Sequence, residues 1–228
     1  MKLFSELGSL IFQTRCALCL AQNIAMKNEL GICLQCSSNL AVHRNIVNRG
    51  SLRIFAGSEF SPTISHVILA TKEDNNSFAR AILAEYLTVA LELASTKDKI
   101  CLIPIPSRKA ANRARGFAHI IKLIEVFSQK NPRKEFVIID CLIHSRKVRD
   151  QSTLNINERE LNMRGAFEIE RSALNRFNEV NISEIPIFLL DDLVTTGSTV
   201  LAAKSALKTR GIGVNGVLTS CATNGFTH

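Results

Sequence analysis

The chain has 228 residues, of which 46% are hydrophobic and 21% are charged, and it contains seven cysteines, one tyrosine and no tryptophan. This length suffices for one α/β domain with a small additional module, and the hydrophobic content excludes a largely disordered chain. The net charge of +8 is concentrated in residues 101–164, which carry 13 basic and 6 acidic residues. Such a region suggests partners that bear phosphate groups, and a solvated face that keeps the protein soluble is the alternative interpretation.

The first residues predict an amphipathic helix, because apolar side chains recur at helical spacing at Leu3, Leu7 and Leu10. The apolar stretches are too interrupted for a secretory signal peptide. No run approaches the roughly 18 apolar residues of a membrane span. We therefore expect a cytoplasmic protein without a membrane span, in a compartment where disulfides are rare.

Two Cys-x2-Cys pairs follow, formed by Cys16, Cys19, Cys33 and Cys36. Two such pairs can close a tetrahedral zinc site, and four thiolates leave no open position, so we expect a structural Zn²⁺. A redox pair or a chance arrangement is the alternative, and a reducing compartment favours zinc. Residues 1–50 are interpreted as a zinc-binding module with four cysteine ligands, and residues 51–228 as the larger domain.

Beyond residue 50, apolar strands alternate with amphipathic helices. Strands are predicted over residues 54–60, 100–106, 136–140, 185–190 and 213–221. Helices are predicted over residues 64–71, 77–94, 117–127 and 198–209. Continuous apolar strands separated by helices are typical of a parallel sheet that is covered on both faces. The predicted fold is therefore α/β, with a mainly parallel twisted sheet flanked by helices.

The stretch IFLLDDLVTTGSTV, residues 187–200, joins a buried strand to a helix, and ligands of such sheets bind at the carboxyl ends of strands. Asp191 and Asp192 can accept hydrogen bonds from adjacent hydroxyl groups, such as those of a ribose. A glycine and small hydroxyl residues then open the helix, where backbone N–H groups and the helix dipole attract phosphate. These residues are Thr195, Thr196, Gly197, Ser198 and Thr199. The stretch predicts a ribose 5-phosphate site, and an ordinary capped strand–helix junction is the alternative.

The same stretch resembles the motif with which type I phosphoribosyltransferases bind phosphoribosyl pyrophosphate (PRPP). Other stretches resemble the ComF/GntX family, whose members begin with Cys-x2-Cys pairs. PIPSRKAANRARGFAH, residues 104–119, carries the family's Pro-x-Pro strand end and its Arg-Gly-Phe, with Ala118 and His119 in place of Asn-Gln. DQSTLNINERELNMRGAF, residues 150–167, carries the family's Gln, Leu, Arg and Asn and its Gly-Ala-Phe. The resemblance covers almost the whole chain.

This resemblance implies a type I phosphoribosyltransferase-like fold and a PRPP site. Asp191 and Asp192 would contact the ribose hydroxyls, and residues 195–199 would surround the 5′-phosphate. The pyrophosphate would face a turn made of Ser107, Arg108 and Lys109, and Mg²⁺ would accompany PRPP. A flexible loop that limits hydrolysis would close over the site and would contain Arg146, Lys147, Arg149, Gln151 and Arg159.

Two functions follow from these expectations. In the first, the protein transfers ribose 5-phosphate from PRPP to an unknown acceptor and releases pyrophosphate. In the second, it is a non-catalytic PRPP sensor that binds single-stranded DNA, because the family is linked to natural transformation; a DNA-uptake helicase would then be a further partner. Arg113 and Arg115 are candidates for contact with nucleic acid or pyrophosphate. With 12 Phe, one Tyr and no Trp, DNA binding would depend mainly on charge.

Overall fold

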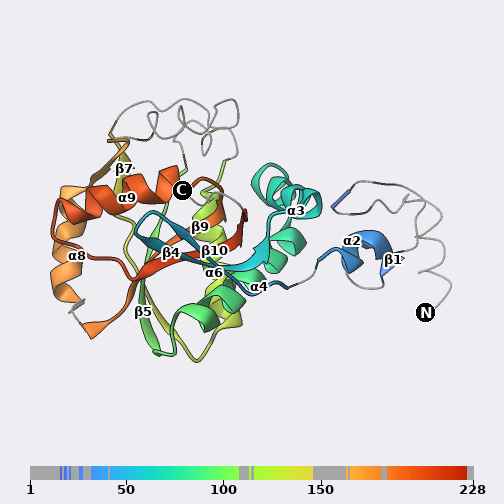
Figure 1. The fold of residues 1–228 in the computed structure, drawn as a ribbon, viewed down its shortest axis with the longest axis horizontal. Coiled ribbons are helices and arrows are strands. Elements are labelled where there is room, and N and C mark those ends of the chain that lie inside the picture. The colour runs from blue at the N-terminus through green and yellow to red at the C-terminus, as the bar shows by residue number, and fades with distance from the viewer. Residues whose placement is uncertain are drawn as a thin grey trace.

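The computed structural model describes residues 16, 18–19, 21, 26–27, 32–40, 42–107, 113, 116–145, 163, 165–180 and 184–224. Its centre is a six-stranded sheet (Figure 1). From one edge to the other the strands are β3 (Asn45–Arg49), β4 (Leu52–Glu59), β10 (Gly216–Ala222), β9 (Ile187–Val194), β5 (Lys99–Pro104) and β6 (Glu135–Ile138). β3 is antiparallel to β4, and the other neighbours are parallel. The predicted α/β fold with a mainly parallel sheet is confirmed.

Helices pack on both faces of this sheet. One face is covered by α3 (Pro62–Lys72), α4 (Ser77–Ala94) and α6 (His119–Lys130). The other is covered by α8 (Leu174–Glu179) and α9 (Ser198–Lys208). A 3₁₀ turn (Arg171–Ala173) precedes α8, and a small antiparallel pair, β7 (Leu142–His144) and β8 (Phe167–Ile169), lies beside α9.

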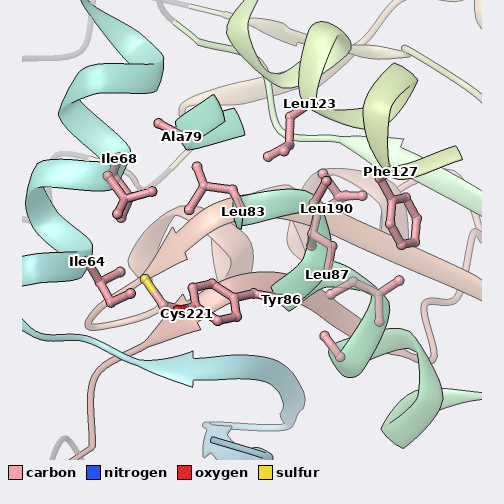
Figure 2. Packing of buried hydrophobic residues seen from close by; sticks show 14 of the residues in the cluster. Ile64, Ile68, Ala79, Leu83, Tyr86, Leu87, Leu123, Phe127, Leu190 and Cys221 are labelled. Carbon is pink, nitrogen blue, oxygen red and sulfur yellow. The ribbon is translucent and has the colours of Figure 1, made fainter. Parts of the chain in front are cut away.

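The central strands β5, β9 and β10 are mostly buried on both faces, which accounts for their apolar runs. In β5, Leu102 packs toward α4 and α6, whereas Cys101 and Ile103 pack toward the opposite cluster. Figure 2 shows the hydrophobic cluster on the face covered by α3, α4 and α6. In it, Leu83 and Leu87 of α4 lie between the sheet and the neighbouring helices. Burying these side chains is the main source of stability in such a core.

The predicted helices and strands of the sheet are all present, with ends that differ by a few residues. The helix over residues 77–94 has its predicted bounds, because Asn76 caps it by accepting a hydrogen bond from Ala79 N at 2.9 Å. The strand predicted over residues 185–190 instead continues to Val194, because β10 keeps pairing with it up to that residue. β3, β7, β8 and α8 were not predicted.

The N-terminal part contains the strand pair β1 (Met26–Lys27) and β2 (Ile32–Cys33) and the helix α2 (Leu34–Ser38). In Figure 1 this part lies on the α3 side of the molecule, far from α8. The helix expected at residues 3–11 lies outside the described residues. The division at residue 50 stays a prediction; β3 before it pairs with β4 after it. Within the described ranges, no helix has both the length and the apolar character needed to cross a membrane.

Candidate functional site

The order in which the chain adds strands to the sheet reverses between β5 and β9. β6 is added on one side of β5, and the next strand of the sheet, β9, is added on the other side. Such a switch point opens a crevice at the carboxyl ends of the two strands, where ligands of open parallel sheets bind. The last pair between these strands joins Pro104 to Leu190, whereas β9 continues beside β10 to Val194. Asp191 and Asp192 therefore lie on the part of β9 that extends beyond β5.

Asp192 is the buried centre of an ionic network. Its Oδ2 accepts a hydrogen bond from Lys72 Nζ at 2.7 Å and another from His119 Nε2 at 2.9 Å. Asp192 is 3% exposed and His119 is fully buried. Burial opposes ionisation of Asp192, but the charge of Lys72 and the hydrogen bond from His119 outweigh it, so the pKa of Asp192 lies well below its ordinary value. Asp192 is therefore held as a carboxylate inside the protein.

Asp191, the preceding residue, has the opposite tendency. It is partly exposed, and its Oδ1 accepts a hydrogen bond from the backbone N–H of Asp192 at 2.9 Å. Burial and the adjacent charge of Asp192 raise the pKa of Asp191 well above its ordinary value, and Lys72 offsets only part of this effect. Two neighbouring acids whose pKa values are displaced in opposite directions are typical of functional sites.

The loop after β9 turns at Gly197, before the start of α9. Gly197 adopts a φ of +82°, a left-handed conformation that glycine adopts most easily. A Cβ at this position would lie 2.7 Å from Arg49 Cβ, so the close approach of Arg49 excludes a side chain as well. Thr196 Oγ1 and Ser198 Oγ are hydrogen-bonded at 2.8 Å. The loop thus brings two hydroxyl groups together at the start of α9.

The side chain of Arg49, at the end of β3, packs against this loop and hydrogen-bonds to it. The side chain is 3% exposed, and its Nε donates to the carbonyl of Thr195 at 2.8 Å. Its Nη2 donates to the carbonyl of Thr223, just after β10. The guanidinium therefore ties the loop to the end of the neighbouring strand and also brings a positive charge beneath it.

The helix starts at the crevice differ from those of α3 and α4. Ser61 caps α3 through a hydrogen bond from Ile64 N at 3.2 Å, and Asn76 caps α4 in the same way. The cap positions of α6 and α9 are Ala118 and Gly197, and neither makes a side-chain capping bond. These two helices follow β5 and β9, so both helix starts at the switch point have cap residues without a capping side chain; in α9 the N–H of Ser198 instead donates to Thr196 Oγ1 at 3.4 Å. An anion can take the place of such a cap.

The described part contains only some of the remaining predicted residues. Ser107 lines a cavity of about 60 Å³ between the end of β5 and the start of α6, together with His119 and Asp140. Arg113 is exposed. The other predicted phosphate-contacting and loop residues lie outside the described residues: Arg108, Lys109, Arg115, Arg146, Lys147, Arg149, Gln151 and Arg159.

The four N-terminal cysteines form a compact cluster. Each of Cys16, Cys19, Cys33 and Cys36 offers one sulfur, and these atoms all lie within 4.8 Å of one another. Cys19 Sγ and Cys33 Sγ are 3.8 Å apart, and a tetrahedral ion with bonds of about 2.3 Å to sulfur requires an edge of about 3.8 Å. The cluster therefore has the composition and spacing to hold a structural metal ion such as zinc.

Backbone donors already surround these sulfurs. Cys16 Sγ accepts from Cys33 N at 3.3 Å, and Cys33 Sγ accepts from Cys36 N at 3.3 Å. Burial opposes ionisation of Cys16, but backbone hydrogen bonds outweigh it and lower its pKa to about 6. Burial and the neighbouring thiols raise the pKa of Cys36. A divalent cation would favour the thiolate form of all four ligands.

Sequence reasoning missed Lys72 and Arg49, and it noted His119 only as a departure from a motif. Each is far in sequence from its partner in the site. The apolar run of β9 indicates only a buried strand, and the partners of Asp192 are identified by the contacts that α3 and α6 make with it.

Comparison with known proteins adds no family assignment. A scan against models of protein families finds none that matches the chain, and a search of curated proteins finds no match either. The site is therefore interpreted from its own geometry.

Proposed function

We propose that this protein is a phosphoribosyltransferase-like protein of the ComF/GntX family that binds PRPP in the crevice between β5 and β9. It would transfer ribose 5-phosphate to an acceptor and release pyrophosphate. The observation that carries this proposal is the junction of β9 and α9, where a pair of carboxylates is followed, after residues 193–197, by a helix start whose cap residue is a glycine. Carboxylates suit sugar hydroxyls, and a helix start suits a phosphate.

The distribution of charge supports the same ligand. A 5′-phosphate at the start of α9 would meet backbone N–H groups, the positive end of the helix dipole and the charge of Arg49 below the loop. The hydroxyl pair of Thr196 and Ser198 offers further donors. Asp191, on the preceding strand, would contact the ribose hydroxyls of the same ligand. A single ligand with sugar hydroxyls at one end and a phosphate at the other would bind both the carboxylate of β9 and the start of α9.

The pyrophosphate is proposed to lie on the β5 side of the crevice. Ser107 and the uncapped start of α6 adjoin there, and Arg108 and Lys109 follow in the sequence. When bound with PRPP, Mg²⁺ would offset the charge that develops on the leaving pyrophosphate. For the cysteine cluster we propose Zn²⁺, because four thiolates at tetrahedral spacing are its usual structural ligands.

Isothermal titration with PRPP and Mg²⁺ tests the proposal directly. We expect saturable binding to one site, and the variant Ser198→Pro should abolish it, because a ring would replace the N–H at the first position of α9. Ser205→Ala, on an exposed turn of the same helix, is the matched control and should bind as the wild type does. If the wild-type protein does not bind PRPP, the proposal is wrong.

Turnover distinguishes the two functions. The protein is incubated with PRPP, Mg²⁺ and pools of nucleobases, amines and other nucleophiles, and pyrophosphate release is measured. Catalytic release that depends on one acceptor would establish the transferase. PRPP binding with no release in any pool would favour the non-catalytic sensor, for which single-stranded DNA is the next ligand to test.

A further inference from the structure

His144 connects two parts of the fold that are distant in the sequence. It is the last residue of β7, and its Nε2 donates a hydrogen bond to the carbonyl of Pro106, just after β5, at 3.1 Å. We propose that His144 is a positioning residue, which fixes the peptide between Pro106 and Ser107 on the side of the crevice assigned to pyrophosphate. This inference rests on the proposed function and names a residue outside the sequence motifs that suggested it.

The strand pair that carries His144 is anchored in the hydrophobic core. β7 pairs with β8 in a register that places His144 opposite Phe167, and the centroids of the two rings are 4.9 Å apart. Leu142 and Phe167 are buried in the cluster on the α9 face of the sheet. Ser145 N continues the pairing with a hydrogen bond to the carbonyl of Ala166 at 3.0 Å. The imidazole therefore donates from a fixed place.

The backbone that accepts this hydrogen bond lies where β5 leaves the sheet. The last pair of β5 with β9 joins Pro104 to Leu190, and Ile105 N still donates to the carbonyl of Leu190 at 2.9 Å. Pro106 has no N–H, so its carbonyl is its one backbone hydrogen-bonding group. Because His144 donates to that carbonyl, it holds the chain in place beyond the last bond to β9.

The geometry of the peptide bond transmits this contact to Ser107. The peptide is trans, and in a planar trans peptide the C=O and the following N–H point in opposite directions. Since the carbonyl of Pro106 points toward His144, the N–H of Ser107 points away from it. Pro106 and Ser107 line the cavity of about 60 Å³ at the start of α6. The contact thus sets the direction of a backbone donor on the side where the pyrophosphate is proposed to lie.

The test compares binding of PRPP with that of ribose 5-phosphate, which lacks the pyrophosphate, by isothermal titration with Mg²⁺. His144→Phe keeps a ring against Phe167 but removes the donor, so its affinity for PRPP should fall about 3- to 10-fold, the range for one hydrogen bond. Its affinity for ribose 5-phosphate should stay within about twofold of the wild type. His144→Gln can still donate to a carbonyl and should recover most of the PRPP affinity. His66→Phe, at an exposed histidine of α3, is the control and should change neither affinity.

A measurement on the wild-type protein tests the same contact without a change in packing. In ¹⁵N-labelled protein the Nε2–H signal of His144 is identified by its loss in His144→Gln. A ligand that accepts from the N–H of Ser107 polarises the peptide and strengthens its carbonyl as an acceptor. The signal should therefore shift when PRPP binds and stay in place when ribose 5-phosphate binds.

The outcomes separate this inference from the proposed function. Wild-type protein that does not bind PRPP overturns both. PRPP affinity that His144→Phe leaves unchanged, or equal losses for the two ligands, overturns only the role of His144. A His144→Gln variant that recovers no affinity does so as well, because packing of the ring would then be what matters. Circular dichroism establishes folding of each variant, and if His144→Phe does not fold, the shift of the Nε2–H signal decides the question.

Discussion

The cysteine cluster and the switch-point crevice are two polar sites built in different ways. The cluster takes its four ligands from residues 16–36, and its sulfurs accept hydrogen bonds from its own backbone. The crevice collects its polar groups from β3, α3, α6 and β9. His119 and Asp192 are 73 residues apart in sequence, and Arg49 and Thr195 are 146 apart. A local site depends on spacing, whereas a distributed site depends on the whole fold.

This difference leads to an expectation about independence. The cluster should be lost without destroying the crevice, because its ligands are local. Ligand binding and stability at the crevice should be sensitive to single substitutions in helices and strands that lie outside the sequence motifs. The following variants test these expectations, in order of decreasing effect.

The largest effect is expected from the double variant Cys16→Ser/Cys19→Ser. It removes two of four ligands, so about one equivalent of tightly bound zinc should disappear, with the loss of roughly 10 kcal/mol of metal-dependent folding free energy in the N-terminal part. Metal analysis of reduced protein measures the first effect, and limited proteolysis measures the second. PRPP affinity should stay within about twofold of the wild type if the sites are independent.

Cys101→Ala is the matched control, because Cys101 is also buried but lies in the opposite hydrophobic cluster of the sheet. It should retain the metal in full. Wild-type protein purified without a bound metal would contradict the zinc assignment, and a large loss of PRPP affinity in the double variant would contradict the independence of the two sites.

The next effect concerns Asp192→Asn. The variant leaves Lys72 and the buried His119 facing a neutral amide, and breaking a buried charge pair costs about 3–5 kcal/mol. Urea unfolding at neutral pH measures the change in free energy. Asp140→Asn is the control: it removes an acid from the end of β6 that makes no ion pair among those found in the described residues. Equal stability of Asp192→Asn and wild type would mean that the network contributes nothing.

A smaller effect is expected from Gly197→Ala, for which the chain provides a close control. Gly197 and Gly211 both have positive φ, at +82° and +72°. A Cβ at Gly197 meets Arg49, whereas nothing lies within 4 Å of a Cβ at Gly211. Gly211→Ala should therefore cost only the backbone strain of about 1 kcal/mol, and Gly197→Ala about 2–3 kcal/mol. Chemical unfolding gives both values, and equal costs would show that Arg49 yields freely.

The extent to which the sequence predicts these features follows from their physical origin. The sheet strands and their helices follow from apolar runs and helical periodicity, and the Cys-x2-Cys spacing predicts the cluster, because these signals are local. β3 was missed because its sequence is largely polar and, at the sheet edge, its residues are half-buried or exposed apart from Arg49. Lys72, His119 and Arg49 were missed as site residues because their roles arise only when distant segments meet. Asp191 and Asp192 were identified as a pair, but only the contacts of Asp192 with Lys72 and His119 distinguish their surroundings.

The smallest effect is the change in the free energy of unfolding expected for Asp191→Asn. Its sign is opposite to that expected for Asp192→Asn. The pKa of Asp191 is raised above the ordinary value of 3.8, so the folded protein holds this proton more tightly than the unfolded chain, and ionised Asp191 opposes folding. Asp191→Asn should therefore raise the free energy of unfolding at pH 7 by about 1 kcal/mol, a value reduced for partial exposure. As the pH falls through the raised pKa toward 4, the wild type becomes protonated and the advantage of the variant should shrink.

The stabilisation from Asp192 has the opposite dependence: because its pKa is lowered, it is present above about pH 4 and is lost as the pH falls further. Urea unfolding of wild type, Asp191→Asn and the exposed control Asp98→Asn between pH 4 and pH 8 measures the difference. A variant that is less stable than wild type at pH 7 would show that Asp191 is a stabilising carboxylate, and the contrast between the two acids would then have to be abandoned.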